Sequence, residues 1–562
     1  MAENFEKQKQ SKPPSLNSKE ASEIAKQVSK SFEEFKQARS TREKKWNECA
    51  KAFMSQHNHE VSDARKWRSQ IYVPLSYEAA TNIYSNLKRA LFPTDSAFFS
   101  VEGMTDAARG KANILKTFLL YQLDSMNFVT KFGNFLKQLV ITGNSAAAIY
   151  WKKTTRLTKE TVEEPLYDGD GNITGYETRV QELDRLIYDG PEFETINMFD
   201  IVFDPAVTNW SEGLVIHRSY RTYDQVKNNP VYKNTVVLAD SNVSRDIGID
   251  SMKAFEMPDS DTDNANLVKL YSAYGDFMVG DKVYYDYIAV VANDEHLIRF
   301  EPNPYQDKPF VFCTYESVPN ELYGIGAIEP GLGIQYLVNT FSNQKADVLS
   351  LIINGMWAYV DDGIIDPEEI IAKPGALIPV KNTDNIRPLH PDNTVALSYN
   401  EISQLKAEYQ EVTGATKYFT GGPSIDFRKT ATEVAALQNA GIVRFSEVIQ
   451  NVEQNALKRA IDIIFNYNSL FNDELNPVNY NLNPDDEFSS FAEDLFNDDY
   501  TFRIVGANSS ISRDIRVNKL IEFIQMASSS PVLAQRVNII ELVKNLYREL
   551  GFKNEDQIFG VE

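Results

Sequence analysis

The chain has almost no cysteine, since Cys49 and Cys313 are the only two in 562 residues. Two thiols so far apart exclude a disulfide-stapled scaffold and are typical of a reducing compartment. No apolar run reaches the length of a bilayer span, and the N-terminus lacks the apolar core of a secretory signal. These absences predict a soluble cytoplasmic protein.

Positive charge is also scarce. The 57 Lys and Arg residues face 79 Asp and Glu residues, which gives a net charge of −22. A protein that grips DNA over its whole surface is basic, so any contact with nucleic acid must here be local or loose. A hydrophobic content of 43% is that of an ordered globular protein. The length predicts about two to four domains.

The sequence contains only weak matches to catalytic, phosphate-binding and metal-binding motifs. The stretch GNSAA (143–147) lacks the last glycine of a nucleophile elbow, and its serine precedes a strand instead of following one. The glycines of 324–333 do not match a phosphate-binding loop. His57 and His59 lack a third metal ligand. The segment DGDGNITG (168–175) lacks the glycine and glutamate that a calcium loop requires, so we predict a hairpin turn there. We predict no catalytic residue, no metal site and no cofactor.

Periodicity divides the first part of the chain. Residues 1–16 are polar and contain proline, so we expect disorder. Helical patterns cover 18–53 and 105–141, and a helix between Pro74 and Pro93 follows an extended stretch. Residues 145–320 are mostly β-prone.

The helical period returns after Pro319. Between Ile334 and Ile353 the apolar residues recur at i, i+3, i+4 and i+7, which predicts a helix about 30 Å long. Its opposite face is mostly uncharged and holds Gln335, Asn339, Ser342, Asn343, Asp347 and Ser350.

A turn-rich insertion and two more helices follow. The insertion covers 356–396, and a second helix begins at Ser398 with an apolar stripe. A loop broken by glycine and proline, 420–429, then carries two adjacent cations. The pattern of 430–468 predicts a third helix about 58 Å long.

This order of elements resembles that of portal proteins, the head-to-tail connectors of tailed double-stranded DNA bacteriophages, and in particular of the short-tailed phages. The similarity covers roughly residues 40–470 and is strongest over 334–468. Further support comes from three stretches, WRSQIYVPLSYE, LKQLVITGNSAAAIYW and PFVFCTYESVPNELYGIGAIEPGLGIQYLVNT. Each stretch is short and degenerate, and the ordered set is more specific than any member.

The resemblance implies an α+β, portal-type subunit. Its expected parts are an N-terminal arm (1–40), a wing of helices followed by β structure (41–326), a first stem helix (327–355), a small β-containing clip (356–397), a second stem helix (398–418), a tunnel loop (419–430), a long wing helix (431–470) and a helical wing and crown region (471–562). Such subunits form a ring, usually a dodecamer, around an axial DNA channel.

The resemblance also implies three groups of site residues. The channel cations of the tunnel loop would be Lys417, Arg428 and Lys429. The partner-docking acids of the clip would be Asp361, Asp362, Asp366, Glu368 and Glu369. The stem-packing residues would be Leu349, Ile352, Leu405 and Tyr409. We expect the uncharged face of 334–353 and the apolar stripe of 398–412 to lie at subunit contacts and around the channel.

The partners implied are further copies of the chain, double-stranded DNA passing non-specifically, the terminase large subunit, head-completion adaptor and tail proteins, and the major capsid and scaffolding proteins. No membrane is implied. The chain would belong to a capsid vertex of the virion after assembly in the host cytoplasm, and a separate ATPase would drive DNA movement. The alternatives are an acidic cytoplasmic hydrolase with a helical dimerisation arm, and another viral tail-ring protein. Arg428 and Lys429 could also simply solvate a surface loop.

Overall fold

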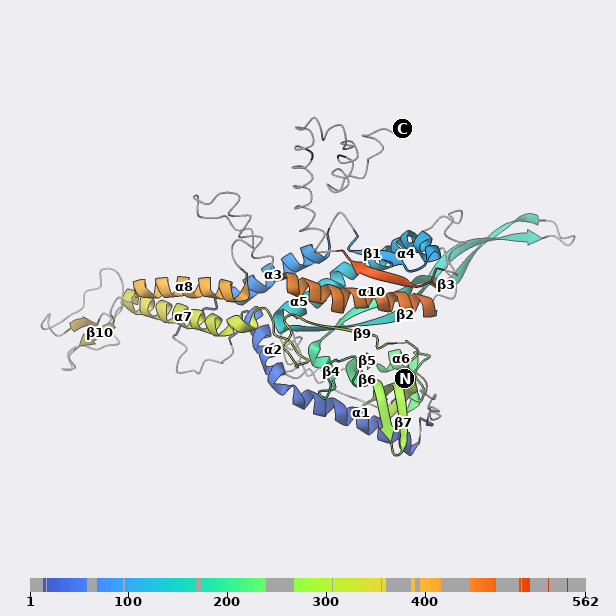
Figure 1. Ribbon diagram of the computed structural model, residues 1–562, viewed down its shortest axis with the longest axis horizontal. Helices are drawn as coiled ribbons and strands as arrows, with labels where there is room; N and C mark the ends of the chain where they lie inside the picture. The colour runs from blue at the N-terminus through green and yellow to red at the C-terminus, as the bar shows by residue number, and fades with distance from the viewer. Residues whose placement is uncertain are drawn as a thin grey trace. The chain divides into compact units, whose positions relative to one another are not determined.

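The structure is a computed structural model, and it describes residues 14–16, 18–57, 68–93, 97–167, 173–238, 267–305, 307–354, 356–359, 386–389, 395–415, 445–471, 495–496, 498–505, 524 and 543. The chain forms two compact units. The first unit comprises 1–45, 83–326 and 442–562, and the second comprises 46–82 and 327–441. Both helices and strands are present, in agreement with the predicted α+β class (Figure 1).

The elements follow one another along the chain. The elements before residue 240 are α1 (Lys19–Ala38), α2 (Ser40–Phe53), α3 (Leu75–Leu91), β1 (Phe99–Gly103), α4 (Asp106–Ser125), α5 (Phe128–Thr142), β2 (Asn144–Tyr167), β3 (Ile173–Ile196), η2 (Met198–Asp200), β4 (Ile201–Phe203), β5 (Val215–Thr222), α6 (Tyr223–Lys227) and η3 (Thr235–Leu238). The later ones are β6 (Leu267–Val279), β7 (Lys282–Ala292), β8 (His296–Pro302), β9 (Phe310–Thr314), η5 (Glu329–Gly331), α7 (Leu332–Asn354), β10 (Met356–Tyr359), β11 (Ile386–Leu389), α8 (Val395–Thr413), the π-helical η8 (Glu453–Lys458), α10 (Arg459–Phe471) and β12 (Tyr500–Ile504).

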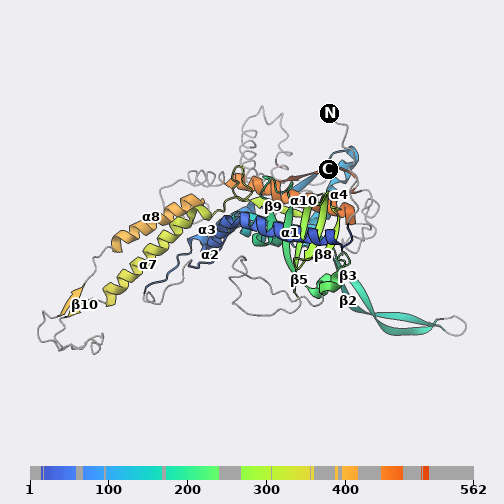
Figure 2. The same cartoon turned by 90° about the horizontal axis from the view of Figure 1, so that it is seen from below.

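A five-stranded antiparallel sheet in the order β4-β5-β6-β7-β8 forms the β core of the first unit. Both of its faces are buried, which explains the nearly continuous apolar run of β7. Alternate residues of that strand serve the two faces, with Tyr287 and Val291 in the core beneath α1, and Ile288 and Val290 in the core beneath α6. The blue α1 runs across this sheet in Figure 2.

Helix α1 is specified locally by its cap and by its stripe. The Ser18 side chain accepts a hydrogen bond from the amide of Ala21 (3.2 Å), as an N-cap should. The buried face then recurs at helical spacing through Ile24, Val28 and Phe32. The helical pattern predicted over 18–53 is interrupted at Arg39, so that two helices replace one.

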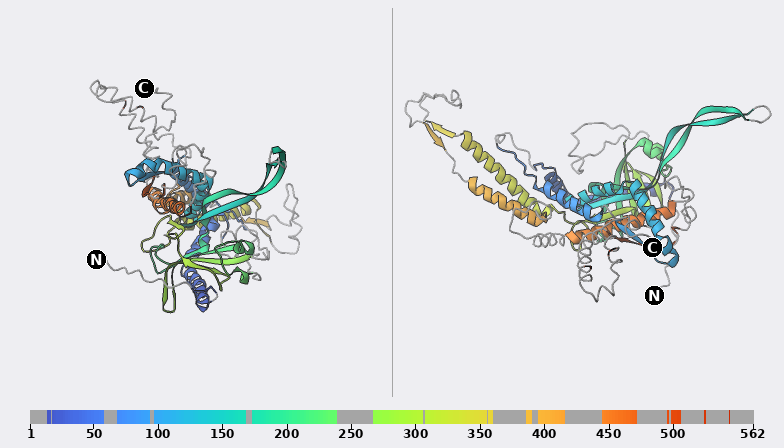
Figure 3. Two further views of the ribbon diagram at one scale, coloured as in Figure 1. Left: turned by 90° about the vertical axis from the view of Figure 1, so that its right-hand side faces the viewer. Right: turned by 90° about the horizontal axis from the view of Figure 1, so that it is seen from above.

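A second sheet, β3-β2-β9, extends into a long ribbon. Strand β9 pairs only with Asn144–Ala148, whereas β2 and β3 stay paired out to Tyr167 and Ile173. The pairing confirms the predicted hairpin, although residues 168–172 themselves lie outside the described residues. Figure 3 shows the two teal strands extending away from the rest of their unit.

The second unit is built on two helices. Helices α7 and α8 lie side by side in all views, and the antiparallel pair β10-β11 follows the end of α7 (Figures 1 and 2). The first helix agrees with the one predicted over 334–353. The third predicted helix, 430–468, is helical throughout its described part, which begins at Phe445 and continues through η8 and α10 to Phe471.

Gly143, between α5 and β2, should be hard to replace. Its φ is +78°, and a Cβ there would lie 2.3 Å from the amide nitrogen of Gly326. We expect Gly143→Ala to cost about 2 kcal/mol or more of stability. Gly110, exposed on α4 with open space around it, is the matched control, and Gly110→Ala should add about 0.5–1 kcal/mol. Calorimetric melting of both variants tests this, and equal melting would contradict it.

Candidate functional site

The mostly uncharged face of α7 binds residues 69–76 of the same chain, here called the strap, which is extended up to Pro74 and then enters the first turn of α3. Four helix side chains spaced four residues apart accept hydrogen bonds from backbone amides of the strap, which are two residues apart at the first three contacts and three residues apart at the last. The bonds run from Ser69 to Asp347 Oδ1 (2.7 Å), from Ile71 to Asn343 Oδ1 (2.6 Å), from Val73 to Asn339 Oδ1 (3.0 Å) and from Ser76 to Gln335 Oε1 (3.0 Å).

The two repeats match in length over the extended part of the strap, from Ser69 to Val73. Four helical residues rise about 6 Å, and two extended residues rise about 6.6 Å, so the contacts stay in step. Two amide side chains also donate back to the strap, Asn343 Nδ2 to the carbonyl of Ile71 (3.0 Å) and Gln335 Nε2 to that of Val73 (2.6 Å). An amide can accept and donate at once, whereas a lysine only donates and a carboxylate only accepts. The composition of this face therefore follows from the backbone that it binds.

The strap is anchored at its buried end by α8. The hydroxyl of Tyr409 donates to Ser76 Oγ (2.9 Å), and Ser76 Oγ donates to Gln335 Oε1 (3.1 Å). Tyr409 is buried, and its burial raises the pKa of the phenol. Its ring lies against Gly331, where a Cβ would come within 2.6 Å of it. One tyrosine thus joins α8, the start of α7 and the strap.

This arrangement corrects one expectation. Gln335, Asn339, Asn343 and Asp347 were expected to face other subunits and the channel, but the structure directs them to the strap. The sequence predicted the polar face of α7, but it did not predict that the strap binds there. No side-chain pattern predicts this contact, because the helix binds backbone amides of a segment more than 250 residues away in sequence.

The four predicted stem-packing residues differ in their surroundings. Tyr409 is buried inside the chain, Leu349 and Leu405 are half-buried, and Ile352 is exposed. The helix pair also leaves other apolar side chains uncovered, namely Leu337 (48% exposed), Ile353 (79%), Tyr399 and Val412. The predicted channel cations Lys417, Arg428 and Lys429 and the predicted clip acids Asp361, Asp362, Asp366, Glu368 and Glu369 lie outside the described residues.

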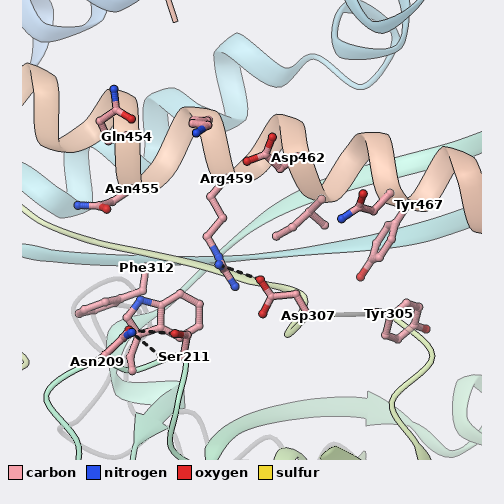
Figure 4. Close-up of a pocket in the computed structure, with 14 residues that line it drawn as sticks. Asn209, Ser211, Tyr305, Asp307, Phe312, Gln454, Asn455, Arg459, Asp462 and Tyr467 are labelled. Carbon is pink, nitrogen blue, oxygen red and sulfur yellow. Dashed lines mark hydrogen bonds and ion pairs between the residues drawn. The ribbon is translucent and has the colours of Figure 1, made fainter. Parts of the chain in front are cut away.

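The first unit contains a pocket of about 390 Å³ that the sequence did not predict (Figure 4). Arg459 at the start of α10 organises it, with Nε donating to the carbonyl of Phe310 (2.8 Å), Nη1 paired with Asp307 (3.0 Å) and the guanidinium over the ring of Trp210 (4.6 Å). The Lys308 ammonium donates to the carbonyl of Ser211 (2.7 Å) and so holds the adjoining loop in place.

The lining of the pocket is suited to binding a polar group rather than to catalysing a reaction. Burial raises the pKa of the Asp462 carboxyl, and Lys458 and Arg459 beside it oppose the shift. The hydroxyl of Ser211 donates to Asn209 (2.9 Å), so it is not placed against a base. The pocket adjoins the π-helical η8, and such turns often accompany functional sites. Its lining residues are Asn209, Trp210, Ser211, Tyr305, Asp307, Phe312, Gln454, Asn455, Lys458, Arg459, Asp462, Ile463, Asn466 and Tyr467.

Several other reactive side chains of the described residues lie in the core. Burial raises the pKa of the Cys313 thiol to about 12 and lowers the pKa of His217 to about 4. Ser145, from the weak nucleophile motif, is also buried. Within the part that the structure describes, no group of three or more His, Cys, Asp or Glu residues is placed to hold a metal ion. Among the described helices, none combines the length and apolarity needed to cross a membrane.

The strap contacts lead to a test by substitution. Asn339→Leu keeps the side-chain size but leaves the Val73 amide without its acceptor, so we expect a loss of about 1–3 kcal/mol. Hydrogen exchange at Val73 and its neighbours should accelerate. Gln344→Leu, on an exposed position of the same helix, is the control and should change stability by less than about 0.5 kcal/mol. Unchanged exchange in Asn339→Leu would show that the strap is held by other contacts.

Comparison with known proteins gives the family of the chain. No curated protein matches the sequence. A family model described as "Phage SU10 portal protein" matches residues 21–561, which is nearly the whole chain. This agrees with the resemblance read from the order of helices, insertion and loop. The chain belongs to the phage SU10 portal protein family.

Proposed function

We propose that this chain assembles into a dodecameric ring at one vertex of a phage capsid, where it forms the channel for DNA packaging and ejection. The ring also serves as the docking platform for the packaging motor and, later, for tail or adaptor proteins. Membership of a portal family supports the general role. The uncovered apolar surface of the α7–α8 pair is the structural observation that carries the assembly part of the proposal.

The strap decides which surface of α7 is available to neighbours. It occupies the polar face, and α8 packs on another, so Leu337 remains among the apolar side chains turned to water. On α8, Tyr399 and Val412 are likewise exposed. Large apolar side chains exposed on one helix pair favour an interaction site there. Helix pairs of neighbouring copies in a ring would cover them.

The charge of the chain fits a channel that does not hold DNA tightly. Twelve acidic subunits repel phosphate over most of their surface, since each carries a net charge of −22. We assign the local attraction to Lys417, Arg428 and Lys429 in and beside the loop 419–430. Non-specific affinity for DNA scales with the number of cations engaged, so a few per subunit permit sliding.

We assign motor and adaptor docking to the segment between β10 and β11, which carries the five acids Asp361, Asp362, Asp366, Glu368 and Glu369. The terminase large subunit and the head-completion adaptor would use the same rim in succession. Contacts with the major capsid and scaffolding proteins would fall elsewhere on the subunit. The hydrolase alternative finds no support at Ser211, whose hydroxyl donates to Asn209, or at Cys313, where burial raises the pKa of the thiol.

Ring formation tests the proposal directly. Leu337→Asp should leave melting unchanged, because the side chain is half-exposed, and should abolish rings, because a charge would be buried between copies. Leu349→Asp should also abolish rings and should lower the melting temperature, because Leu349 is half-buried. Val236→Asp, at an exposed apolar position of η3, is the matched control and should assemble normally. Mass photometry and negative-stain images give the readout, and normal rings in both leucine variants would refute the stem assignment.

The loop cations have a separate test in the virus. Arg428→Ala combined with Lys429→Ala should leave rings intact and let packaging begin, because neither residue is assigned to assembly. Filled heads should then lose DNA faster on storage, and the difference should shrink as salt screens the contacts. The measurement is the yield of full particles and their DNA content over time. Equal retention at every salt concentration would return both residues to the role of loop solvation.

A further inference from the structure

One row of side chains along the pocket of the first unit has no partner in the fold. Its members, here called the α10 row, are spaced four residues apart on η8 and α10, namely Gln454, Lys458, Asp462 and Asn466. None of them has a hydrogen-bond or ion-pair partner among the described residues. The neighbouring Arg459 is paired with Asp307, and Figure 4 draws that contact but none from Asp462. Polar groups at a pocket wall that the fold leaves unpaired are available to a ligand.

Asp462 is the most informative member of the α10 row. Its carboxyl is half-buried, and burial raises its pKa although Lys458 and Arg459 lie near it. A half-buried carboxylate without a donor costs stability, so its position on a pocket wall indicates a ligand that donates a hydrogen bond. Lys458 is the opposite case, because an ammonium only donates. A ligand along the row therefore offers an acceptor and a donor about 6 Å apart.

Helix α7 carries a row of the same spacing, and the structure shows what that row binds. There Asp347 accepts from a backbone amide of the strap, and Asn343 both accepts from and donates to the strap backbone. The α10 row offers the same functions, since Asp462 can accept from an amide and Asn466 can do both. Lys458 adds a donor for a backbone carbonyl. Four helical residues again correspond to two extended residues in length.

The aromatic rings of the pocket disfavour a nucleobase as the ligand. Bases bind to proteins largely by stacking on aromatic side chains. Here each ring already packs on a neighbour, with Arg459 over Trp210 (4.6 Å), Tyr467 against Tyr305 (5.1 Å between ring centroids) and Phe203 against Phe312 (4.7 Å). The carboxylate of Asp462 would also repel a phosphate.

We propose that the α10 row binds an extended peptide segment of a partner protein through its backbone, as α7 binds the strap. A carbonyl of the segment accepts from Lys458, and an amide two residues away donates to Asp462. The pocket of about 390 Å³ beside the row accommodates a side chain of the segment. The residue whose amide faces Asp462 cannot be proline, which has no N–H. All residues of this site belong to the first unit, so binding does not depend on ring formation.

Asp462→Leu separates a ligand site from a structural role. The change removes a half-buried carboxylate that has no donor, so the full-length chain should melt at the same temperature or higher. Binding of a peptide should nevertheless weaken about tenfold or more, because a hydrogen bond to a charged group is lost. Asp124→Leu, at an exposed position of α4, makes the same chemical change and should bind as the parent chain does.

The probe is a fluorescein-labelled peptide with blocked ends, Arg-Ser-Gln-Ile-Tyr-Val, which copies residues 68–73. Fluorescence anisotropy with the full-length chain should show saturable binding with a Kd of about 1 mM or below. The same peptide with every backbone amide methylated should not bind, because it has no N–H to donate. A benzophenone in place of the tyrosine of the peptide should cross-link to 454–467 or to 209–211.

Several outcomes would overturn the site. Lower melting of Asp462→Leu would show that the carboxylate stabilises the fold instead. Absence of saturable binding, equal binding of the methylated peptide, or cross-links confined to α7 would show that the α10 row does not recognise backbone. Saturable binding of maltotriose or of a thymidine pentanucleotide in place of the peptide would assign the pocket to another class of ligand. These results leave the ring untouched, since its own test uses Leu337 and Leu349.

Discussion

The match in rise between a helix and an extended strand governs the second unit. From Ser69 to Val73 each step of four residues on α7 meets a step of two on the strap, and each contact, here called a rung, joins one side chain to one backbone amide. A slip of one residue on either partner would break all of them together. The match therefore fixes the rotation of α7 about its axis, and Tyr409 fixes α8 against the same point. The strap and the α7–α8 contact cover part of the two helices, and the apolar surface that we assign to ring formation is the part that remains exposed.

Sequence patterns predicted what is local and missed what is distant. The period of residues 334–353 gave the helix, and the turn residues of 168–175 gave the hairpin, because each signal lies within its own element. The strap escaped prediction because side chains there bind backbone, which carries no side-chain signature. The pocket escaped because it depends on Arg459 reaching Asp307 and Trp210 across the fold. The helical pattern of 18–53 did not mark the break at Arg39, whose guanidinium donates to Glu43 (2.8 Å).

The stretch GNSAA shows how packing can imitate a catalytic motif. Gly143 has no room for a Cβ, and the neighbouring Asn144 side chain bonds Gly324 in both directions, accepting from its amide (2.8 Å) and donating to its carbonyl (3.1 Å). A glycine followed by a small polar residue is what two closely packed backbones require. In hydrolases the similar G-x-S-x-G motif forms a sharp turn that exposes the serine. Here Ser145 is buried inside the sheet that this junction begins.

The rungs between the strap and α7 also determine how the unit responds to force. They lie across the helix axis in parallel, so a load along that axis is shared among them and must break them together. A load that lifts the strap outward from Ser69 meets the rungs singly, beginning at the more exposed end and reaching the buried Ser76 last. The pair is thus strong in shear and weak in peeling. Tension along α7 would therefore load all the strap contacts at once, whereas an outward pull at Ser69 would break them one after another.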